Sequence, residues 1–385
     1  MHSARIHKVI FRMISLFYRF GFWHGEDKPT AIQLGQKSFY CIYYLLFNIS
    51  FAIGAITKET VDESIFLAEG SFIIIVMTTK IWMLLWKQRS IMELLDRVCV
   101  FSIRNDKDFA FFNDKVEKFI KFVNVYGCAA MVGSLGCSIF PFIGKKNSFV
   151  MEFAFPLDWE NSEIGFWVTY IFFTSENIVT FLSMAYSVII WYLLLQCSLR
   201  YTILGREIRN MGRITSGGNI KMTRKEQPTI FYQDLVAAIE AHFHLRGLIC
   251  EVESFLSRLF LLQFATSGLC ICCSIYCLAF DVSVNTLERI IHFYTFFYNI
   301  AELFMITYLG NEIMLSSSGL SYSLFESEWV EQAHSTQKCL IVFGEYLKRS
   351  QEMLIGKLYP LTLETFTRIL KSSYSLFNVI KNTKQ

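Results

Sequence analysis

The sequence predicts an all-α membrane protein with seven transmembrane helices, a cytoplasmic N-terminus, an extracellular C-terminus and a cytoplasmic helical anchor domain. Three observations lead to this prediction. Of the 385 residues, 53% are hydrophobic and 18% are charged, whereas about 25% are charged in an average soluble domain. Six apolar runs are long enough to cross a bilayer, which takes about 20 helical residues. Lysine and arginine are concentrated in alternate loops, a pattern typical of cytoplasmic loops.

The first expected element is a short amphipathic helix over residues 8–20. Its apolar side chains share one face at helical spacing: Val9, Met13, Leu16, Phe17 and Phe20. Positively charged side chains lie on the opposite face. A helix of this kind can lie on the inner membrane surface. The alternative is a helix that packs on the rest of the protein.

Six apolar spans follow, and a polar helix is expected between the fourth and the fifth. The spans are expected at 39–56, 65–86, 122–143, 165–197, 255–280 and 290–315. The fourth span is long enough to project beyond the bilayer. Residues 230–254 repeat apolar side chains at helical spacing and run directly into the fifth span, which predicts a cytoplasmic helical bundle continuous with the membrane helices.

The charges in the loops predict the orientation. The N-terminal segment has six lysines and arginines, and the second and fourth loops have eight each, whereas the loops between them have one, two and one. The positive loops are therefore expected in the cytoplasm. The chain then divides into six segments. Three are expected in the cytoplasm: 1–38 with an interfacial helix, 201–254 with a loop and a helix, and 316–356 with a loop and the anchor helix. The other three contain the membrane helices: 39–200 with helices 1–4, 255–315 with helices 5 and 6, and 357–385 with the last helix and the extracellular C-terminus.

The closing stretch, residues 359–380, is long enough to span a membrane but has one polar face. That face has Glu364, Arg368, Lys371, Ser375, Asn378 and Asn382, and the opposite face has Leu363, Phe366, Leu370, Tyr374, Phe377 and Ile380. A charge facing lipid costs about 2.5–3.5 kcal/mol at mid-helix. The polar stripe should therefore face water, protein or another copy of the helix, as in a helix that lines a conduction path. The alternative is a cytoplasmic amphipathic helix packed on a bundle.

The outer halves of four spans combine large apolar side chains with isolated polar groups, which is typical of a cavity for a small volatile or lipid-like ligand. Ordinary helix packing is the alternative at each position. The residues are Phe72, Ile73, Val76 and Met77 in the second span, Ser134, Cys137 and Ser138 in the third, Phe166, Tyr170, Phe173, Thr174 and Asn177 in the fourth, and Phe293, Tyr294, Phe297 and Tyr298 in the sixth.

Other clusters of reactive side chains are interpreted as structural. Glu240 and His242 are two residues apart and do not share the helix face that a metalloprotease-like pair requires. Four cysteines within the fifth span are interpreted as small residues at helix contacts: Cys270, Cys272, Cys273 and Cys277. The sequence lacks a nucleophile elbow, a P-loop and a dinucleotide fingerprint. We therefore expect neither an enzyme nor a cofactor, metal or nucleic acid partner.

The C-terminal third resembles the insect odorant receptors. Tyr359-Pro360-Leu361-Thr362-Leu363-Glu364-Thr365-Phe366, followed by Ile369-Leu370-Lys371 and by Ser373-Tyr374-Ser375-x-Phe377, is similar to the closing signature of that family. Asp234-Leu235, His242, Leu262-Gln263-Phe264 and Cys270 resemble the segment that leads into the family's fifth helix. Ser327-Glu328-Trp329 resembles its aromatic loop motif.

The resemblance implies a function and a set of partners. Insect odorant receptors are ligand-gated, non-selective cation channels, built as heterotetramers of an odour-tuned subunit and the coreceptor Orco. The long fourth-loop insertion of the coreceptor is missing here, so the chain resembles the tuned subunit. The implied partners are the coreceptor, a small volatile ligand and membrane lipid, and the implied location is the plasma membrane of a sensory neuron dendrite.

The same resemblance implies roles for particular residues. Residues 335–356 would form the cytoplasmic anchor helix, and the closing helix would line the pore, with Ser375, Val379 and Thr383 at the pore or gate. A gustatory-type channel, a G-protein-coupled receptor and a secondary transporter remain as alternatives. The predicted topology is opposite to that of a G-protein-coupled receptor, and no internal repeat of the transporter kind is present.

Overall fold

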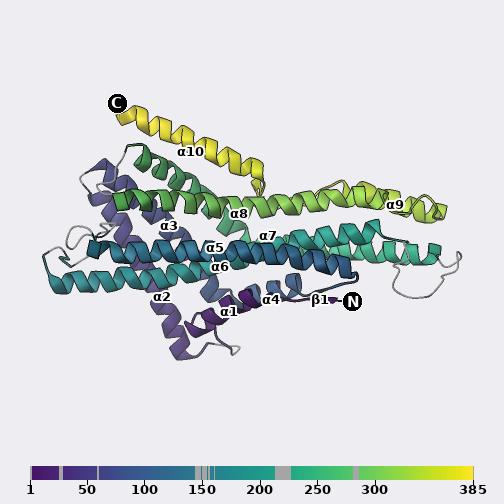
Figure 1. Cartoon of the computed structure of the whole chain (residues 1–385), viewed down its shortest axis with the longest axis horizontal. Coiled ribbons are helices and arrows are strands. Elements are labelled where there is room, and N and C mark those ends of the chain that lie inside the picture. Colours follow the sequence, from purple (N-terminus) through teal and green to yellow (C-terminus); the bar gives the residue numbers. More distant parts are fainter. Residues whose placement is uncertain are drawn as a thin grey trace.

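The computed structural model describes residues 2–25, 29–58, 60–143, 149, 154, 157–159, 161–212, 227–280 and 286–384. These residues form an elongated bundle of helices with two very short sheets (Figure 1). Six of the described helices are long and apolar enough to cross a membrane. The prediction of an all-α membrane protein is confirmed at this level.

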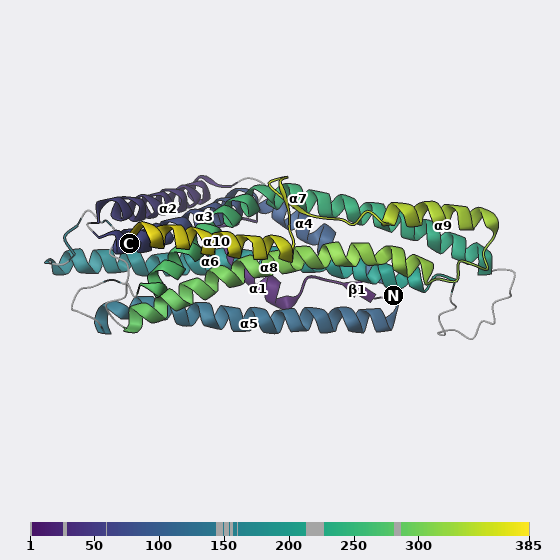
Figure 2. The ribbon, with the colours of Figure 1, turned by 90° about the horizontal axis from the view of Figure 1, so that it is seen from above.

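The six apolar runs all become helices, and most of these helices extend beyond the expected spans. Their bounds are α2 Ala31–Thr57, α3 Val61–Trp86, α5 Asp106–Ile143, α6 Glu163–Arg209, α7 Gln227–Ala279 and α8 Thr286–Phe325. The helix expected over 230–254 is the first half of α7 and continues without a break into the fifth apolar run. At about 1.5 Å per residue, the three longest helices, α6, α7 and α8, far exceed a hydrocarbon core of about 30 Å. They run along most of the long axis in Figures 1 and 2.

The N-terminal segment packs against the C-terminal end of α3. It consists of β1 (His2–Ala4) and α1 (Lys8–Arg19), and β1 pairs antiparallel with β2 (Phe101–Ile103), which follows the short helix α4 (Gln88–Cys99). Two side chains satisfy carbonyls at the end of α3: Trp23 Nε1 donates to Leu84 O at 2.8 Å, and Lys37 Nζ donates to Leu85 O at 2.8 Å. Ile10, Ile14 and Phe17 of α1 are buried in the main core, so the amphipathic helix packs on the protein through this face.

The end of the bundle opposite the C-terminus is built from the polar halves of α7 and α8 and from α9 (His334–Leu347). His242 of α7 is buried there among aromatic rings that include those of Tyr201 and Tyr346. The helix expected over 335–356 ends at Leu347. The chain then forms the hairpin of β3 (Leu354–Ile355) and β4 (Tyr359–Pro360), whose turn has positive φ angles at Gly356 and Lys357.

The closing helix α10 (Leu363–Lys384) lies along α7 and α8 at the edge of the bundle (Figures 1 and 2). It begins at Leu363 rather than Tyr359, because Tyr359 and Pro360 pair with β3. Ser373 Oγ donates to Gly268 O of α7 at 2.9 Å, and Phe377 is buried. The opposite face, which includes Glu364, is exposed in the single chain.

Candidate functional site

A cavity of about 660 Å³ lies between α3, α5, α6 and α8, with phenylalanines of α2 at its side. It brings together most of the residues that the sequence analysis selected. The selected residues that line it are Ile73, Met77, Ser134, Cys137, Ser138, Phe173, Thr174, Asn177, Tyr294 and Tyr298. A volume of this size is typical of sites for small ligands.

The other selected residues lie elsewhere among the described helices. Val76 lines a second, much smaller cavity. Tyr170 packs in an aromatic cluster with Phe142, Phe166 and Trp167. The remaining three are on α3 and α8 outside the lining: Phe72 is half-buried, whereas Phe293 and Phe297 are 47% and 62% exposed.

Polar groups are a minority in the cavity wall, and several of them are already hydrogen-bonded. Asn177 Nδ2 of α6 donates to Ser138 Oγ of α5 at 2.9 Å, and that hydroxyl donates to Ser134 O at 3.0 Å. These bonds join the two helices across the cavity wall. Thr174 Oγ1 is buried and has no hydrogen-bond partner among the described residues. Its hydroxyl is therefore available to a ligand in a mainly apolar space.

Gly133 shapes the cavity by its lack of a side chain. A Cβ atom built on Gly133 would lie 2.8 Å from Cε1 of the Tyr294 ring and closer still to its Cζ. Carbon atoms at optimal contact are about 3.5–4.0 Å apart. The close approach of α5 and α8, and hence the position of Tyr294 in the wall, depends on this glycine.

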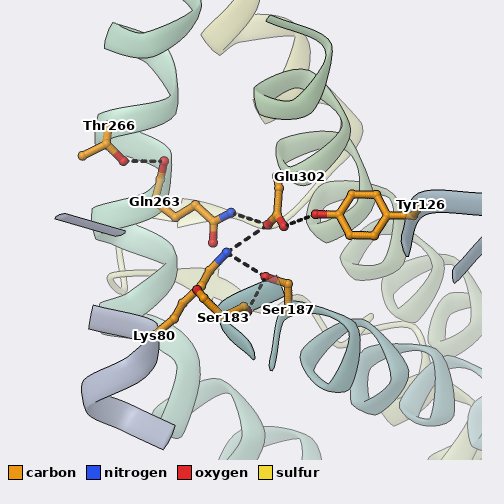
Figure 3. A network of polar contacts seen from close by, with 7 residues as sticks. All are labelled: Lys80, Tyr126, Ser183, Ser187, Gln263, Thr266 and Glu302. Carbon is orange, nitrogen blue, oxygen red and sulfur yellow. Dashed lines mark hydrogen bonds and ion pairs between the residues drawn. The ribbon is translucent and has the colours of Figure 1, made fainter. Parts of the chain in front are cut away.

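A buried ion pair lies next to the cavity (Figure 3). Lys80 Nζ of α3 is 3.0 Å from Glu302 Oε2 of α8, and the two side chains are 3% and 4% exposed. Lys80 also donates to Ser187 Oγ of α6 at 2.8 Å. Glu302 accepts from Tyr126 OH of α5 at 2.7 Å and from Gln263 Nε2 of α7 at 3.0 Å. Five helices therefore meet at one pair of opposite charges.

The ion pair and the large cavity are connected through shared residues. Lys80, Gln263 and Glu302 line a cavity of about 20 Å³, which has Ile73, Met77 and Tyr298 in common with the larger one. Gln263 lies on α7, and Gly268 on the same helix accepts the hydrogen bond from Ser373 of α10. Continuous contacts therefore lead from the cavity wall through α7 to the closing helix.

Sequence analysis missed the charged residues of this region. Glu176 lines the cavity and is 9% exposed, with Thr180 Oγ1 donating to its carboxylate. Lys80, Glu176 and Glu302 each lie within an apolar run. An ionisable residue inside a membrane-spanning segment is expensive and marks a functional or structural site. Applied to these runs, that rule would have found all three.

The three pore candidates lie on α10. Ser375 and Val379 are exposed in the single chain. The side chain of Thr383 lies outside the described residues. The buried side of α10 has Phe377, which packs with Tyr276 and Cys277 of α7.

Comparison with known proteins places these features in a wider group. A family model described as 7tm Odorant receptor matches residues 67–374. Odorant receptor 23a of Drosophila melanogaster is 28% identical over 247 residues, which cover 62% of this chain and 61% of that protein. Odorant receptor 94a of the same organism is 22% identical over 99% of this chain and 98% of that protein.

The fold is similar to that of solved structures. The insect olfactory receptor OR5 from Machilis hrabei, solved in complex with eugenol, superposes with a TM-score of 0.80 at 13% identity and covers 98% of both chains. A second structure of the same receptor gives a TM-score of 0.79 at 12% identity and covers 96% of this chain and 98% of that chain.

Proposed function

The chain belongs to the insect odorant receptor family, and on this basis we propose that it is the odour-binding subunit of a ligand-gated, non-selective cation channel. The observation that carries the proposal is the cavity between α3, α5, α6 and α8. Members of the family are ligand-gated cation channels rather than enzymes. The proposal therefore assigns the ligand to the cavity and conduction to the closing helix.

The lining of the cavity suits a small, mainly apolar volatile with one hydrogen-bonding group. Aromatic and aliphatic side chains supply most of the wall, and the Thr174 hydroxyl is unpaired. A buried hydroxyl without a partner loses the free energy of a hydrogen bond, about 0.5–1.5 kcal/mol net. A ligand oxygen that pairs with Thr174 would recover it. The related olfactory receptor solved with eugenol, a small aromatic molecule with oxygen substituents, agrees with this class of ligand.

The membrane topology is the second part of the proposal. The six apolar helices are complemented by α10 as a seventh span, with the N-terminus in the cytoplasm and the C-terminus outside. The distribution of lysine and arginine over the loops supports this orientation. The cytoplasmic segments are then 1–38, 201–254 and 316–356, and the membrane segments are 39–200, 255–315 and 357–385, in the plasma membrane.

Conduction requires partner chains, because one α10 helix cannot enclose a pore. We assign the exposed polar face of α10 to a pore shared with coreceptor subunits in a tetramer, with Ser375, Val379 and Thr383 along it. The exposure of Glu364, Ser375 and Val379 in the single chain supports this assignment. Arg368 Nη2 lies 2.8 Å from Glu364 Oε1, so this face has an ion pair that lipid would not solvate.

Opening would follow from a shift between two arrangements of the helices. The ligand binds the open arrangement more tightly and moves α8 relative to α3. The Glu302–Gln263 contact transmits that movement to α7, against which α10 packs. A shift from 1% to 99% open requires about 5.5 kcal/mol of differential affinity, which a small ligand supplies only when it is largely enclosed.

The test is the response of Thr174→Val, which removes the unpaired hydroxyl and nearly preserves the shape of the side chain. Co-expressed with the coreceptor, this variant should need about two- to tenfold more of an alcohol or ketone agonist, as expected for a lost hydrogen bond of about 0.5–1.5 kcal/mol. Its response to a hydrocarbon of the same size should stay the same. Thr307→Val is the matched control, because Thr307 is buried on α8 outside both cavities and bonds to Leu303 O.

Two results would contradict the assignment of the cavity. One is an equal loss of sensitivity to the oxygenated agonist and the hydrocarbon. The other is a loss of the same size in the Thr307→Val control. Surface labelling of both variants separates these results from failed delivery to the membrane.

A further inference from the structure

Three side chains that can bind a transition metal lie together near the end of the bundle at which the C-terminus lies, and none of them lines the odorant cavity. They are Glu69 of α3, Cys277 of α7 and His292 of α8, and their ligand atoms all lie within 4.8 Å of one another. Their exposed fractions are 0%, 1% and 3%. No two of them are on the same helix, so the fold itself brings them together.

Two of these side chains have polar atoms without a partner. Glu69 Oε1 accepts a hydrogen bond from Ser274 Oγ, but Glu69 Oε2 has no partner within the part of the chain that the structure describes. The same is true of His292 Nδ1, whose ring is held edge-on by Phe66 at a centroid distance of 4.4 Å. Buried polar groups are normally paired, and buried charges pair or bind metals. Both orphan atoms are therefore available as metal ligands.

We propose that Glu69, Cys277 and His292 form a binding site for Zn²⁺. A thiolate, an imidazole and a carboxylate are the side-chain groups that zinc takes in proteins, and three of them leave the fourth position of a tetrahedron to water. Bond lengths of about 2.0–2.3 Å place tetrahedral ligand atoms about 3.5 Å apart. Small side-chain rotations bring atoms that now lie within 4.8 Å to that separation.

The charges of the site favour the same ion. Binding leaves Cys277 as a thiolate and Glu69 as a carboxylate and releases the protons that they held to solvent, while the imidazole of His292 binds as the neutral base. The divalent cation, one thiolate and one carboxylate then sum to zero. A neutral assembly avoids the large cost of an isolated charge in an apolar interior.

The site touches the closing helix. Cys277 belongs to a buried cluster with Tyr276 of α7 and Phe377 of α10. A bound ion would tie α3 and α8, which line the odorant cavity, to α7 beside α10. In the proposed topology this end of the bundle faces outside the cell, and the expected effect on gating rests on that proposed function. External zinc should then restrain the helix movement and reduce odorant-evoked current.

Metal binding is tested on the full chain purified in detergent, without any channel assay. After loading with zinc and removal of free metal, the wild type should retain one zinc ion per chain more than Cys277→Ser/His292→Gln. The matched control is Cys339→Ser/His244→Gln, which removes one thiol and one imidazole from exposed positions and should retain the ion. Equal zinc in the wild type and the first variant would overturn the proposal.

A measurement on the wild type alone covers the case in which the double variant does not fold. Cobalt(II) bound in place of zinc should give the near-ultraviolet charge-transfer absorption of a thiolate ligand, and zinc should displace it. Absence of that absorption at saturating cobalt would overturn the proposal. Zinc binding without odorant-evoked current would leave the site intact and contradict the channel function, so the two failures are distinguishable.

Discussion

The ion pair between Lys80 and Glu302 makes a quantitative prediction. Both side chains are at most 4% exposed and 3.0 Å apart. Lys80→Met removes the cation and leaves the carboxylate with neutral donors, which include Tyr126 and Gln263. Removal of one partner from a buried pair costs about 3–5 kcal/mol. We expect Lys80→Met to lower the free energy of unfolding by that amount.

A second substitution should restore much of the stability that Lys80→Met loses. Lys80→Met/Glu302→Gln has no buried charge, and the glutamine keeps an oxygen that can accept from Tyr126. The double variant should therefore be about 2 kcal/mol more stable than Lys80→Met alone, because residues in one network have non-additive effects on stability. Thermal unfolding of the detergent-solubilised chain measures the order of stability.

The control is an exposed ion pair on the same protein. Lys118 and Asp114 are 2.7 Å apart on α5, with side chains 67% and 54% exposed, and a pair of this kind contributes about 0.3–0.5 kcal/mol. Lys118→Met should therefore change stability little. The reasoning is refuted if Lys80→Met is as stable as Lys118→Met, or if the double variant is less stable than Lys80→Met.

Three further predictions concern the cavity, the closing helix and the end of the bundle opposite the C-terminus. Gly133→Ala places a methyl group too close to the Tyr294 ring in the cavity wall. The added methyl group and the displaced ring change the cavity shape, so sensitivity to the bulkiest agonists of a homologous series should fall while surface expression is preserved. Equal sensitivity across the series would contradict this. Val379→Ala should raise the basal current of the assembled channel, and unchanged leak would count against its place at the gate. Burial lowers the pKa of His242 from 6.5 to about 4. Between pH 6.5 and about 4, the unfolded chain therefore binds a proton at this residue that the folded chain does not. The free energy of unfolding should fall as the pH falls through this range. Thermal midpoints against pH should show that dependence in wild type and in His244→Phe, but not in His242→Phe.

The apolar runs predicted the membrane helices because burial in lipid imposes a strong compositional signal. They did not predict the full lengths, since the extensions beyond the bilayer are amphipathic rather than uniformly apolar. Helix α5 begins at Asp106, well before the apolar run over 122–143. The resemblance placed the anchor helix over 335–356, and it missed the hairpin that follows Leu347 because its strands are only two residues long.

The sequence predicted which helices line the cavity, but not which face of each helix lines it. Tyr294 and Tyr298 are four residues apart and line the cavity together, whereas Phe297, one residue before Tyr298, is turned to the outside. Composition treats the three aromatic residues alike, because a side chain that faces lipid and one that faces an apolar cavity have the same chemistry. Tyr170 is likewise one turn from Thr174, and it packs in the aromatic cluster beyond the cavity.

The pairing of Lys80 with Glu302 could not come from periodicity. The two residues are 222 positions apart in the sequence, and only the tertiary arrangement of α3 and α8 brings them together. The same holds for Glu69, Cys277 and His292. Sequence reasoning can mark each ionisable residue in an apolar run as unusual, but the partner is set by the tertiary structure.

The most direct test of the proposed function is the whole-cell current of cells that express this chain with and without the coreceptor during exposure to a panel of small volatiles. We predict a rapid cation current that requires both subunits and persists when G proteins are blocked. A response that this blockade abolishes would contradict the channel and indicate a metabotropic receptor instead.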